Sequence, residues 1–301
     1  MNEKYYSALK QLQKESSLLN WFKFFSIETW NRINFARSKA GLKIYETTIT
    51  QNLLLNIRMF AETKTLPIEM FEATSEKTNG NDIEIVLEIE EGKYIILPCQ
   101  AKIVWKNQKY PTIKHKVNKT ENQIDLLISY AEKVQGIPIY LFYNWFNDSS
   151  YLKDIEHEIR KKDQLFDYEL YGCSIACAHK IKKCFAKPFP LKKIKWEIPS
   201  FKDLHPEIAI PLYFIALNYN LDNFKKLFPT INPEAIKIYS EDEIMNNNLW
   251  RNLFPSSGIG YVRSQGLKFE PVSFFNKFTP SSRIVFQKNL PKKGNTISLI
   301  S

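Results

Sequence analysis

The chain has 301 residues, of which 44% are hydrophobic, 25% charged and 14% aromatic, and it contains only nine glycines. This composition excludes disordered, collagen-like and low-complexity proteins, and it predicts one or two folded globular domains. No apolar run reaches the ~18 residues that a membrane-spanning helix needs, and the first residues lack the apolar core of a signal peptide. We therefore expect a cytoplasmic protein that does not enter a membrane.

Basic residues outnumber acidic ones, with 42 Lys and Arg against 32 Asp and Glu, which gives a formal net charge of +10. Such an excess favours a polyanionic partner, because lysines and arginines that neutralise phosphates release the counterions around them. The four cysteines are too few for a disulfide framework and predict reduced thiols. The charge therefore favours nucleic acid as the partner but does not identify it.

Taken in chain order, the hydrophobic pattern predicts an α/β protein. Residues 1–43 show helical spacing and predict two helices, and residues 45–60 predict a third, with Glu46 in its first turn. Three strands then follow at 68–74, 82–89 and 93–105. A lysine-rich link leads to a helix at 123–134, a buried strand at 136–145, and one more strand and helix. We divide the chain into an N-terminal helical segment (1–43), an α/β unit (44–184) and a C-terminal appendage of unknown role (185–301).

Pairing within the predicted hairpin defines a candidate site. A three-residue loop of Glu90, Glu91 and Gly92 would set Ile89 opposite Lys93 and, counting outward, Asp82 opposite Gln100. Period-two alternation then gives the hairpin one wholly apolar face and a second face that carries Asp82, Glu84, Gln100 and Lys102. Pro98 in the second strand indicates an edge position or a bulge.

The polar residues at the open end of this hairpin suit metal-assisted chemistry. Carboxylate, amide and backbone oxygens are the ligands that a hard divalent cation prefers, and Mg²⁺ fits best. The ammonium of Lys102 could orient an attacking water and stabilise negative charge that develops on a phosphoryl centre. A solvated polar sheet face is the alternative interpretation of the same pattern.

These residues resemble a known superfamily. Asp82, followed after the hairpin by Gln100-Ala101-Lys102, a helix and a short apolar strand, is similar to the PD-(D/E)XK nuclease superfamily in the Gln-x-Lys form of Mrr-like restriction endonucleases. The resemblance covers roughly residues 44–145. It implies a restriction-endonuclease-like core made of a helix, a three-stranded antiparallel part, a helix and a strand. The region lacks the Pro before Asp82, and Gln100 replaces the more usual Glu.

The resemblance also implies residue roles. Asp82, Glu46 and Gln100 would surround Mg²⁺ or Mn²⁺, Lys102 would be the catalytic lysine, and Gln123 matches a polar position near such sites. Because a neutral Gln100 removes one negative charge from the metal site, Glu84 or Glu72 could supply the missing carboxylate.

A basic link follows the candidate site directly and could bind a phosphate backbone and stack a base on Trp105, Tyr110 or His115. A solvated loop is the alternative. The candidate nucleic-acid-binding residues in it are Lys106, Lys109, Lys114, Lys116 and Lys119.

We therefore expect a metal-dependent endonuclease that hydrolyses phosphodiester bonds in DNA, with a role in restriction or anti-phage defence implied by the resemblance alone. Two alternatives remain open: a nucleic-acid-binding module on the same fold that has lost catalysis, and a nuclease that acts on RNA. Cleavage of both strands with one site per chain would favour a homodimer.

Overall fold

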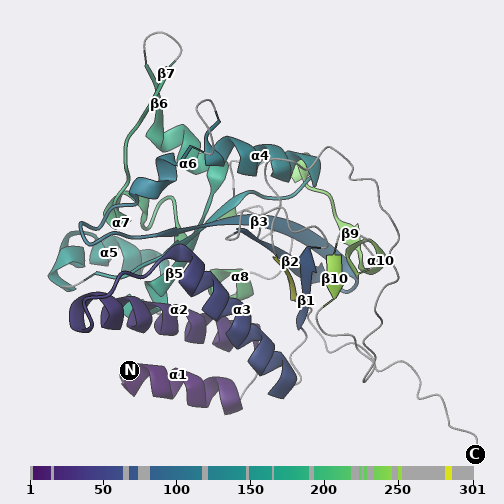
Figure 1. The fold of residues 1–301 in the computed structure, drawn as a ribbon, viewed down its shortest axis with the longest axis horizontal. Coiled ribbons are helices and arrows are strands. Elements are labelled where there is room, and N and C mark those ends of the chain that lie inside the picture. The colour runs from purple at the N-terminus through teal and green to yellow at the C-terminus, as the bar shows by residue number, and fades with distance from the viewer. Residues whose placement is uncertain are drawn as a thin grey trace, which may run out of the picture.

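The protein is a mixed α/β structure built around one mixed sheet (Figure 1). The structure is a computed structural model, and it describes residues 3–14, 17–63, 68–73, 82–116, 121–146, 149–164, 166–189, 193–217, 224, 227–228, 233–245, 250–252 and 282–286. In these segments, no helix combines the length and the apolarity needed to cross a membrane.

The helices are α1 (Glu3–Lys14), α2 (Leu18–Asn34), α3 (Glu46–Thr63), α4 (Gln123–Lys133), α5 (Lys153–Lys162), α6 (Ala178–Phe185), α7 (Phe201–Leu204), α8 (Phe214–Leu217) and α10 (Glu241–Met245). Helices α1, α2, α3, α4 and α6 correspond to predicted helical segments, whereas α5, α7, α8 and α10 were not predicted. A π-helical turn, η1 (Phe35–Lys39), continues α2. Short 3₁₀ turns follow at η2 (Pro111–Lys114), η3 (Ser149–Leu152), η4 (Tyr168–Gly172) and η5 (Pro233–Ala235).

The main sheet has the strand order β10-β1-β11-β2-β3-β4-β5-β8, and β9 pairs with β3. β6 and β7 form a separate two-stranded sheet that projects from the body (Figure 1). The strand bounds are β1 (Ile68–Ala73), β2 (Asp82–Glu90), β3 (Lys93–Ile103), β4 (Ile139–Tyr143), β5 (Cys173–Cys177), β6 (Ala186–Phe189), β7 (Lys193–Trp196), β8 (Ile210–Pro211), β9 (Tyr239–Ser240), β10 (Trp250–Asn252) and β11 (Ser282–Phe286).

The hairpin register predicted from the sequence is confirmed, since Asp82 pairs with Gln100. The connection differs from the predicted three-residue loop: Glu90 pairs with Lys93, and a register shift between Glu88 and Glu90 makes Ile89 an extra residue. Gly92 adopts the expected positive φ of 67°, and its N–H donates to the Glu88 carboxylate at 2.8 Å.

Pro98 does not mark a sheet edge, because β3 lies between β2 and β4. The parallel ladder with β4 begins at Cys99 opposite Ile139, so the proline nitrogen lies just before that ladder. A parallel pair needs a long crossover, and α4 provides it between β3 and β4.

The three predicted strands are not consecutive neighbours. β11, from the region predicted as an appendage, lies between β1 and β2, antiparallel to β1 and parallel to β2. β8, β9 and β10 also come from beyond residue 185 and join the same sheet. Residues after 185 therefore complete the sheet of the preceding α/β unit.

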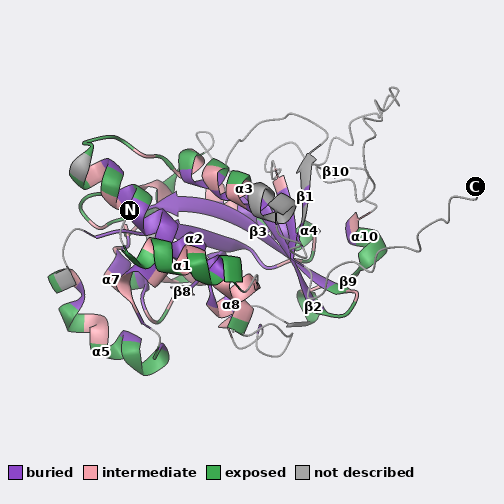
Figure 2. Cartoon of the chain, turned by 90° about the horizontal axis from the view of Figure 1, so that it is seen from below, coloured by how far each residue is buried: buried purple, intermediate pink, exposed green. Residues whose placement is uncertain are grey.

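Helices cover both faces of this sheet. α1, α2 and α3 lie on one side and α4 and α6 on the other (Figure 1), and the view from below shows the strands buried behind α1–α3 (Figure 2). The apolar hairpin face, which includes Ile85, Leu97 and Cys99, belongs to the same core cluster as Trp21 and Phe22 of α2. On the other face Val86 and Ile96 pack with Ile244 of α10 and Val285 of β11. The residues Gln100 and Lys102 alternate onto this second face.

Candidate active site

β3 carries two polar side chains into the interior on the face covered by α4. Gln100 is only 2% exposed and Lys102 only 4%, although both side chains are polar. The whole strand from Tyr94 to Ile103 is buried. Burying an amide or an ammonium costs free energy unless polar partners surround it. Their position therefore requires a local polar environment, which the neighbouring elements provide for Lys102.

Lys102 is held by residues of α4 and β4. Its Nζ donates a hydrogen bond to Gln123 Oε1 at 2.7 Å and lies 5.8 Å from the centre of the Tyr140 ring. Gln123 is the first residue of α4, and Tyr140 pairs with Gln100 across the β3–β4 ladder. An ammonium beside a helix N-terminus meets the positive end of the helix dipole, so the Gln123 oxygen offsets an unfavourable electrostatic setting.

Gln100 has an unused acceptor. Its Oε1 atom is buried and has no hydrogen-bond partner within the described part of the chain. Buried polar atoms in proteins are nearly always hydrogen-bonded, so such an atom calls for an explanation, and an unplaced ion is one of the recognised ones. An amide oxygen of this kind is also an acceptable ligand for a hard cation.

Asp82 is opposite Gln100 in the hairpin register, and strand alternation sets position 82 on the same sheet face as Gln100 and Lys102. The side chain of Asp82 lies outside the described residues. The side chain of Glu72 does too, and its strand β1 is separated from β2 by β11. Position 72 is therefore two strands away from position 82.

Glu46 reaches the end of β3, as its position in the first turn of α3 predicted. Its Oε1 accepts hydrogen bonds from the Ile103 backbone N–H at 3.2 Å and from Thr112 Oγ1 at 3.1 Å. The next backbone carbonyl, of Val104, accepts from the Arg37 guanidinium. Burial lowers the pKa of Arg37, and the negative charge of Glu46 offsets part of that effect. Glu46 is thus attached to the residue that follows Lys102.

Glu84 shares the site face but is occupied elsewhere. One carboxylate oxygen bonds the Arg283 guanidinium at 2.5–2.6 Å, and the other accepts from Tyr130 OH at 2.8 Å. Burial, reinforced by the negative charge of Glu84, raises the pKa of Tyr130. We assign Glu84 to a buried ion pair that joins β2 and β11 rather than to a metal.

The basic link contains both exposed and buried residues. Four of its five candidate lysines are exposed, namely Lys106, Lys109, Lys114 and Lys116, whereas Lys119 lies outside the described residues. Trp105 is 50% exposed, but Tyr110 is fully buried and donates to Asn144 Oδ1 at 2.6 Å. Tyr110 therefore cannot stack a base, and its aromatic ring belongs to the core.

No three His, Cys, Asp or Glu side chains come together as a metal-binding group in the part of the chain that the structure describes. The Asp82 side chain lies outside that part of the chain, and the amide of Gln100 is a further oxygen donor. Residues that could contribute oxygen ligands at this end of the hairpin are Asp82, Gln100 and Glu46.

Sequence reasoning missed several residues around the site. Tyr140 lies beneath the Lys102 ammonium, and its only sequence signal is its place in the predicted buried strand. Arg37 contacts the end of β3. The sequence feature that could have drawn attention to it is the absence of acidic residues from positions 35–45. Arg283 gave no local signal, because its partner Glu84 is 199 positions away.

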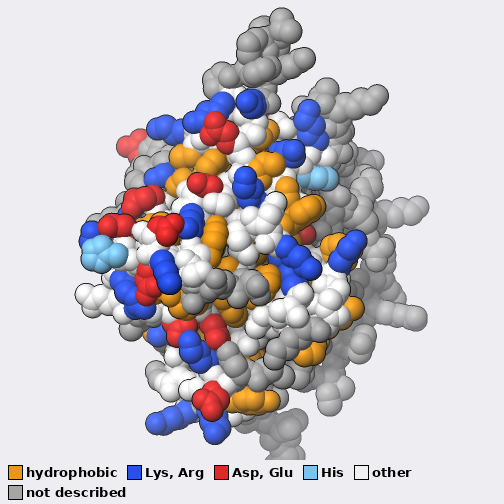
Figure 3. Space-filling view, turned by 90° about the vertical axis from the view of Figure 1, so that its left-hand side faces the viewer, with side chains coloured by type: hydrophobic (Ala, Val, Ile, Leu, Met, Phe, Trp, Pro, Cys, Tyr) orange, Lys and Arg blue, Asp and Glu red, His pale blue; other side chains and the backbone are white. Residues whose placement is uncertain are grey.

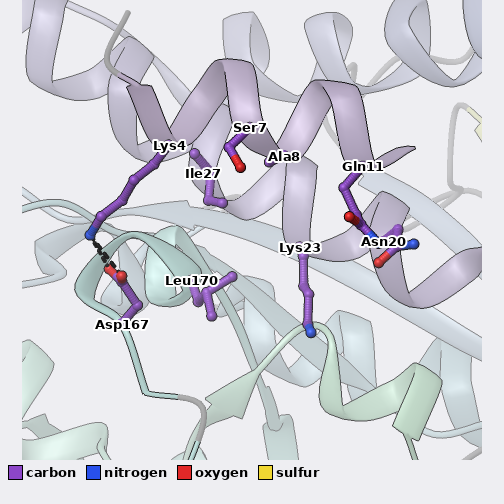
Figure 4. A pocket seen from close by; sticks show the side chains of 9 residues that line it. All are labelled: Lys4, Ser7, Ala8, Gln11, Asn20, Lys23, Ile27, Asp167 and Leu170. Carbon is purple, nitrogen blue, oxygen red and sulfur yellow. Dashed lines mark hydrogen bonds and ion pairs between the residues drawn. The ribbon is translucent and has the colours of Figure 1, made fainter. Parts of the chain in front are cut away.

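A cavity of about 320 Å³ lies on the other side of the sheet from α4, between α1, α2 and the segment around η4 (Figure 4). Lys4 donates to Asp167 at one end of it, while Lys23 and Asn20 line the other (Figure 4). Its lining contains none of the candidate site residues.

The fold and the site together define a mixed α/β protein with a buried amide–lysine–amide cluster at one end of a central hairpin. The chain belongs to DUF6615, a family of unknown function, whose model matches residues 18–257. That match includes every candidate site residue and excludes α1 and β11. No curated protein and no solved structure matches the chain.

Proposed function

We propose that this protein is a divalent-metal-dependent nuclease with a restriction-endonuclease-like core, and that it hydrolyses phosphodiester bonds in DNA. The observation that carries the proposal is the buried contact between Lys102 and Gln123 beside the unsatisfied oxygen of Gln100. Buried polar atoms are nearly always hydrogen-bonded, so the unpaired oxygen of Gln100 next to a buried ammonium supports a ligand at this position.

The order of elements also supports the proposal. A helix with an acidic first turn (α3) precedes the β2–β3 hairpin, and α4 then crosses over to β4, parallel to β3. This is the order implied by the resemblance to PD-(D/E)XK nucleases. The same hairpin pairing sets Asp82 opposite Gln100, which is the register that the resemblance requires.

The residues fit a magnesium or manganese ion. Gln100 Oε1 is a buried oxygen that lacks a partner among the described groups, and the backbone register sets position 82, an aspartate, opposite Gln100. Glu46 could provide a second carboxylate from the end of β3. When bound, the ion would supply Lewis-acid activation of the phosphate and a more acidic water.

The chain's own groups account for the remaining chemistry. Lys102 would position water and stabilise the negative charge that grows on the phosphoryl oxygens. Gln123 is a positioning residue, because its hydrogen bond fixes the direction of the Lys102 ammonium. Glu46 holds the backbone of Ile103 and so fixes the strand segment from which Lys102 projects.

The test is a cleavage assay on plasmid, linear duplex and single-stranded DNA, with an RNA arm, in Mg²⁺, Mn²⁺ and EDTA. Asp82→Ala should abolish cleavage at every metal concentration, because it removes a charged ligand. Lys102→Met keeps most of the side-chain volume and should lower the rate on the order of 10²–10³-fold. Gln123→Ala should lower the cleavage rate less than Lys102→Met does, and it should change the pH profile of the rate. Gln100→Glu should lower the metal concentration that gives half-maximal cleavage.

Lys93→Met is the matched control, because Lys93 lies at the exposed start of the same strand and its ammonium forms an exposed ion pair with Glu90. It should cleave like the parent. A parent protein that binds DNA but leaves DNA and RNA intact in both metals would overturn the nuclease proposal in favour of a binding module. Cleavage by Asp82→Ala at the parent rate would overturn the assigned site.

A further inference from the structure

An exposed surface of aromatic, aliphatic and basic side chains borders the candidate active site. Phe35, Leu42, Tyr45 and Trp105 are 58%, 62%, 57% and 50% exposed, which is unusual for side chains of this size. They come from two segments, 35–45 and 103–109. We call this surface the aromatic-basic face and define it by Phe35, Arg37, Leu42, Lys43, Tyr45, Trp105, Lys106 and Lys109.

Hydrogen bonds hold these two segments together directly after Lys102. Glu46, next to Tyr45, accepts from the Ile103 backbone N–H at 3.2 Å. Arg37 donates to the Val104 carbonyl, the residue before Trp105. The backbone of Trp105 is fixed in turn, because its N–H donates to Lys109 O at 2.8 Å. Tyr45 and Trp105 therefore project from backbone that is anchored at the end of β3.

The two segments of this surface are basic, and the one carboxylate described at their junction, that of Glu46, is bonded to the Ile103 N–H and to Thr112. Segments 35–45 and 103–116 contain seven Lys and Arg residues and no Asp or Glu. On the side of the molecule seen in Figure 3, basic and hydrophobic side chains intermix on the right half, whereas acidic ones gather mainly on the left. This distribution complements a polyanion rather than a neutral or acidic partner surface.

The aromatic groups restrict which polyanion fits. In a duplex the bases are stacked on each other, so a duplex offers its phosphates and groove edges but not its base faces. Unpaired nucleotides expose their base faces, and proteins that bind single strands combine a basic groove with aromatic side chains on which bases stack. Lysines alone would bind a duplex and a single strand equally well. The exposed Tyr45 and Trp105 therefore favour a single strand over a duplex.

We infer that the aromatic-basic face binds single-stranded nucleic acid, with bases stacked on Tyr45 and Trp105 and phosphates paired with Lys106 and Lys109. The inference rests on the proposed function, and it names the substrate class of the same site: a strand with unpaired nucleotides next to the scissile phosphate. The face adjoins the backbone of Ile103 and Val104, the two residues that follow Lys102 in the chain.

The experiment measures binding by the full chain in EDTA, so that cleavage plays no part. Fluorescein-labelled probes of one length are compared by anisotropy: single-stranded DNA, single-stranded RNA, the DNA duplex, and a DNA strand whose central nucleotides are abasic. The parent should bind the single strands more tightly than the duplex and the abasic strand, because the abasic strand retains the phosphates and lacks the stacking bases.

Trp105→Ala and Tyr45→Ala should each weaken single-strand binding roughly 5- to 100-fold and leave binding of the abasic strand unchanged. Tyr6→Ala is the matched control, because Tyr6 is similarly exposed (53%) but lies on α1. That variant should bind all four probes like the parent.

The outcomes separate this inference from the nuclease proposal. A parent that cleaves DNA but binds duplex and abasic strands as tightly as intact single strands would overturn the inference and leave the nuclease proposal standing. A parent that shows the stacking-dependent preference but never cleaves would support the inference and overturn catalysis. If no nucleic acid binds, the inference is wrong.

Discussion

His205 is a neutral histidine in the core and makes the stability of the protein depend on pH. Its ring stacks on Phe201 at 3.9 Å, and its Nε2 lies 2.9 Å from Ser174 Oγ. Ser174 Oγ also accepts from Asn144 Nδ2, so the histidine belongs to a buried hydrogen-bond network. Burial lowers the pKa of His205 to about 4, against only a partial opposing effect of the Phe201 carbonyl.

We predict that this histidine destabilises the fold in mild acid. Because the folded-state pKa lies below the unfolded value of about 6.5, the unfolded chain binds the proton first as the pH falls. The stabilising contribution of neutral His205 to the free energy of unfolding is therefore fully present above about pH 6.5. It is lost progressively as the pH falls to the folded-state pKa, and the total loss is about 3 kcal/mol. Urea unfolding at a series of pH values between about 7.5 and 4.5 measures it.

His205→Gln is the comparison variant, since it keeps a polar side chain that can bond Ser174. It should be less stable than the parent near neutrality, yet its stability should change less with pH over the same window. Equal pH slopes for the two proteins would mean that another group carries the acid sensitivity.

At the level of secondary structure, the ion pair between Glu84 and Arg283 joins β2 to β11. Both side chains are almost fully buried, with 0% and 3% of their surface exposed. A buried pair contributes little net stability by itself, but removing one partner leaves an uncompensated charge in the interior.

Arg283→Met should therefore lower the free energy of unfolding by about 3–5 kcal/mol. The double variant Glu84→Gln with Arg283→Met should regain most of that loss, because Gln retains an acceptor for Tyr130 and no charge stays buried. Lys93→Met breaks the exposed Glu90–Lys93 pair and should cost less than about 1 kcal/mol. Urea midpoints with an unchanged slope measure all three. A double variant as unstable as the single one would contradict this account.

The elements that sequence reasoning predicted are those with a local pattern. Counting outward from the predicted turn at Gly92 gave the Asp82–Gln100 register, and helical spacing located α1, α2, α3 and α4. Within the site, the contact of Lys102 with Gln123 agrees with the expected position of Gln123. β11 could not be predicted, because a pairing that spans 199 positions leaves no local trace. Tyr110 is buried against a distant residue, Asn144. Its burial could not be predicted, because the lysines near it in the sequence are exposed.

Considered as a whole, the molecule carries a formal charge of +10, and its basic segments lie next to the candidate site. If this charge serves nucleic-acid binding, the logarithm of the affinity should fall linearly with the logarithm of salt concentration, with a slope of about 0.9 per duplex phosphate neutralised and about 0.7 on a single strand. Replacing Lys114 and Lys116 together by Ala should reduce that slope by up to about two.

The matched control for this measurement is the Ala replacement of Lys161 and Lys162 on α5. It removes the same net charge, but these lysines pair with Glu158 and Glu207 on the exposed surface. Its salt slope should equal that of the parent. Equal reductions in both variants would show that overall charge, and not the basic link, governs the salt dependence.

The location of β11 has a consequence for how the chain is made. β11 lies between β1 and β2, so the sheet stays split until residues 282–286 have left the ribosome. During synthesis the earlier strands would expose unpaired backbone on both sides of that gap, which is the condition that promotes aggregation of nascent chains. Pairing across so long a separation is also slow, because the loop must close before its contacts form. If the proposed site depends on the completed sheet, its activity would appear only after residues 282–286 have emerged and paired with β1 and β2.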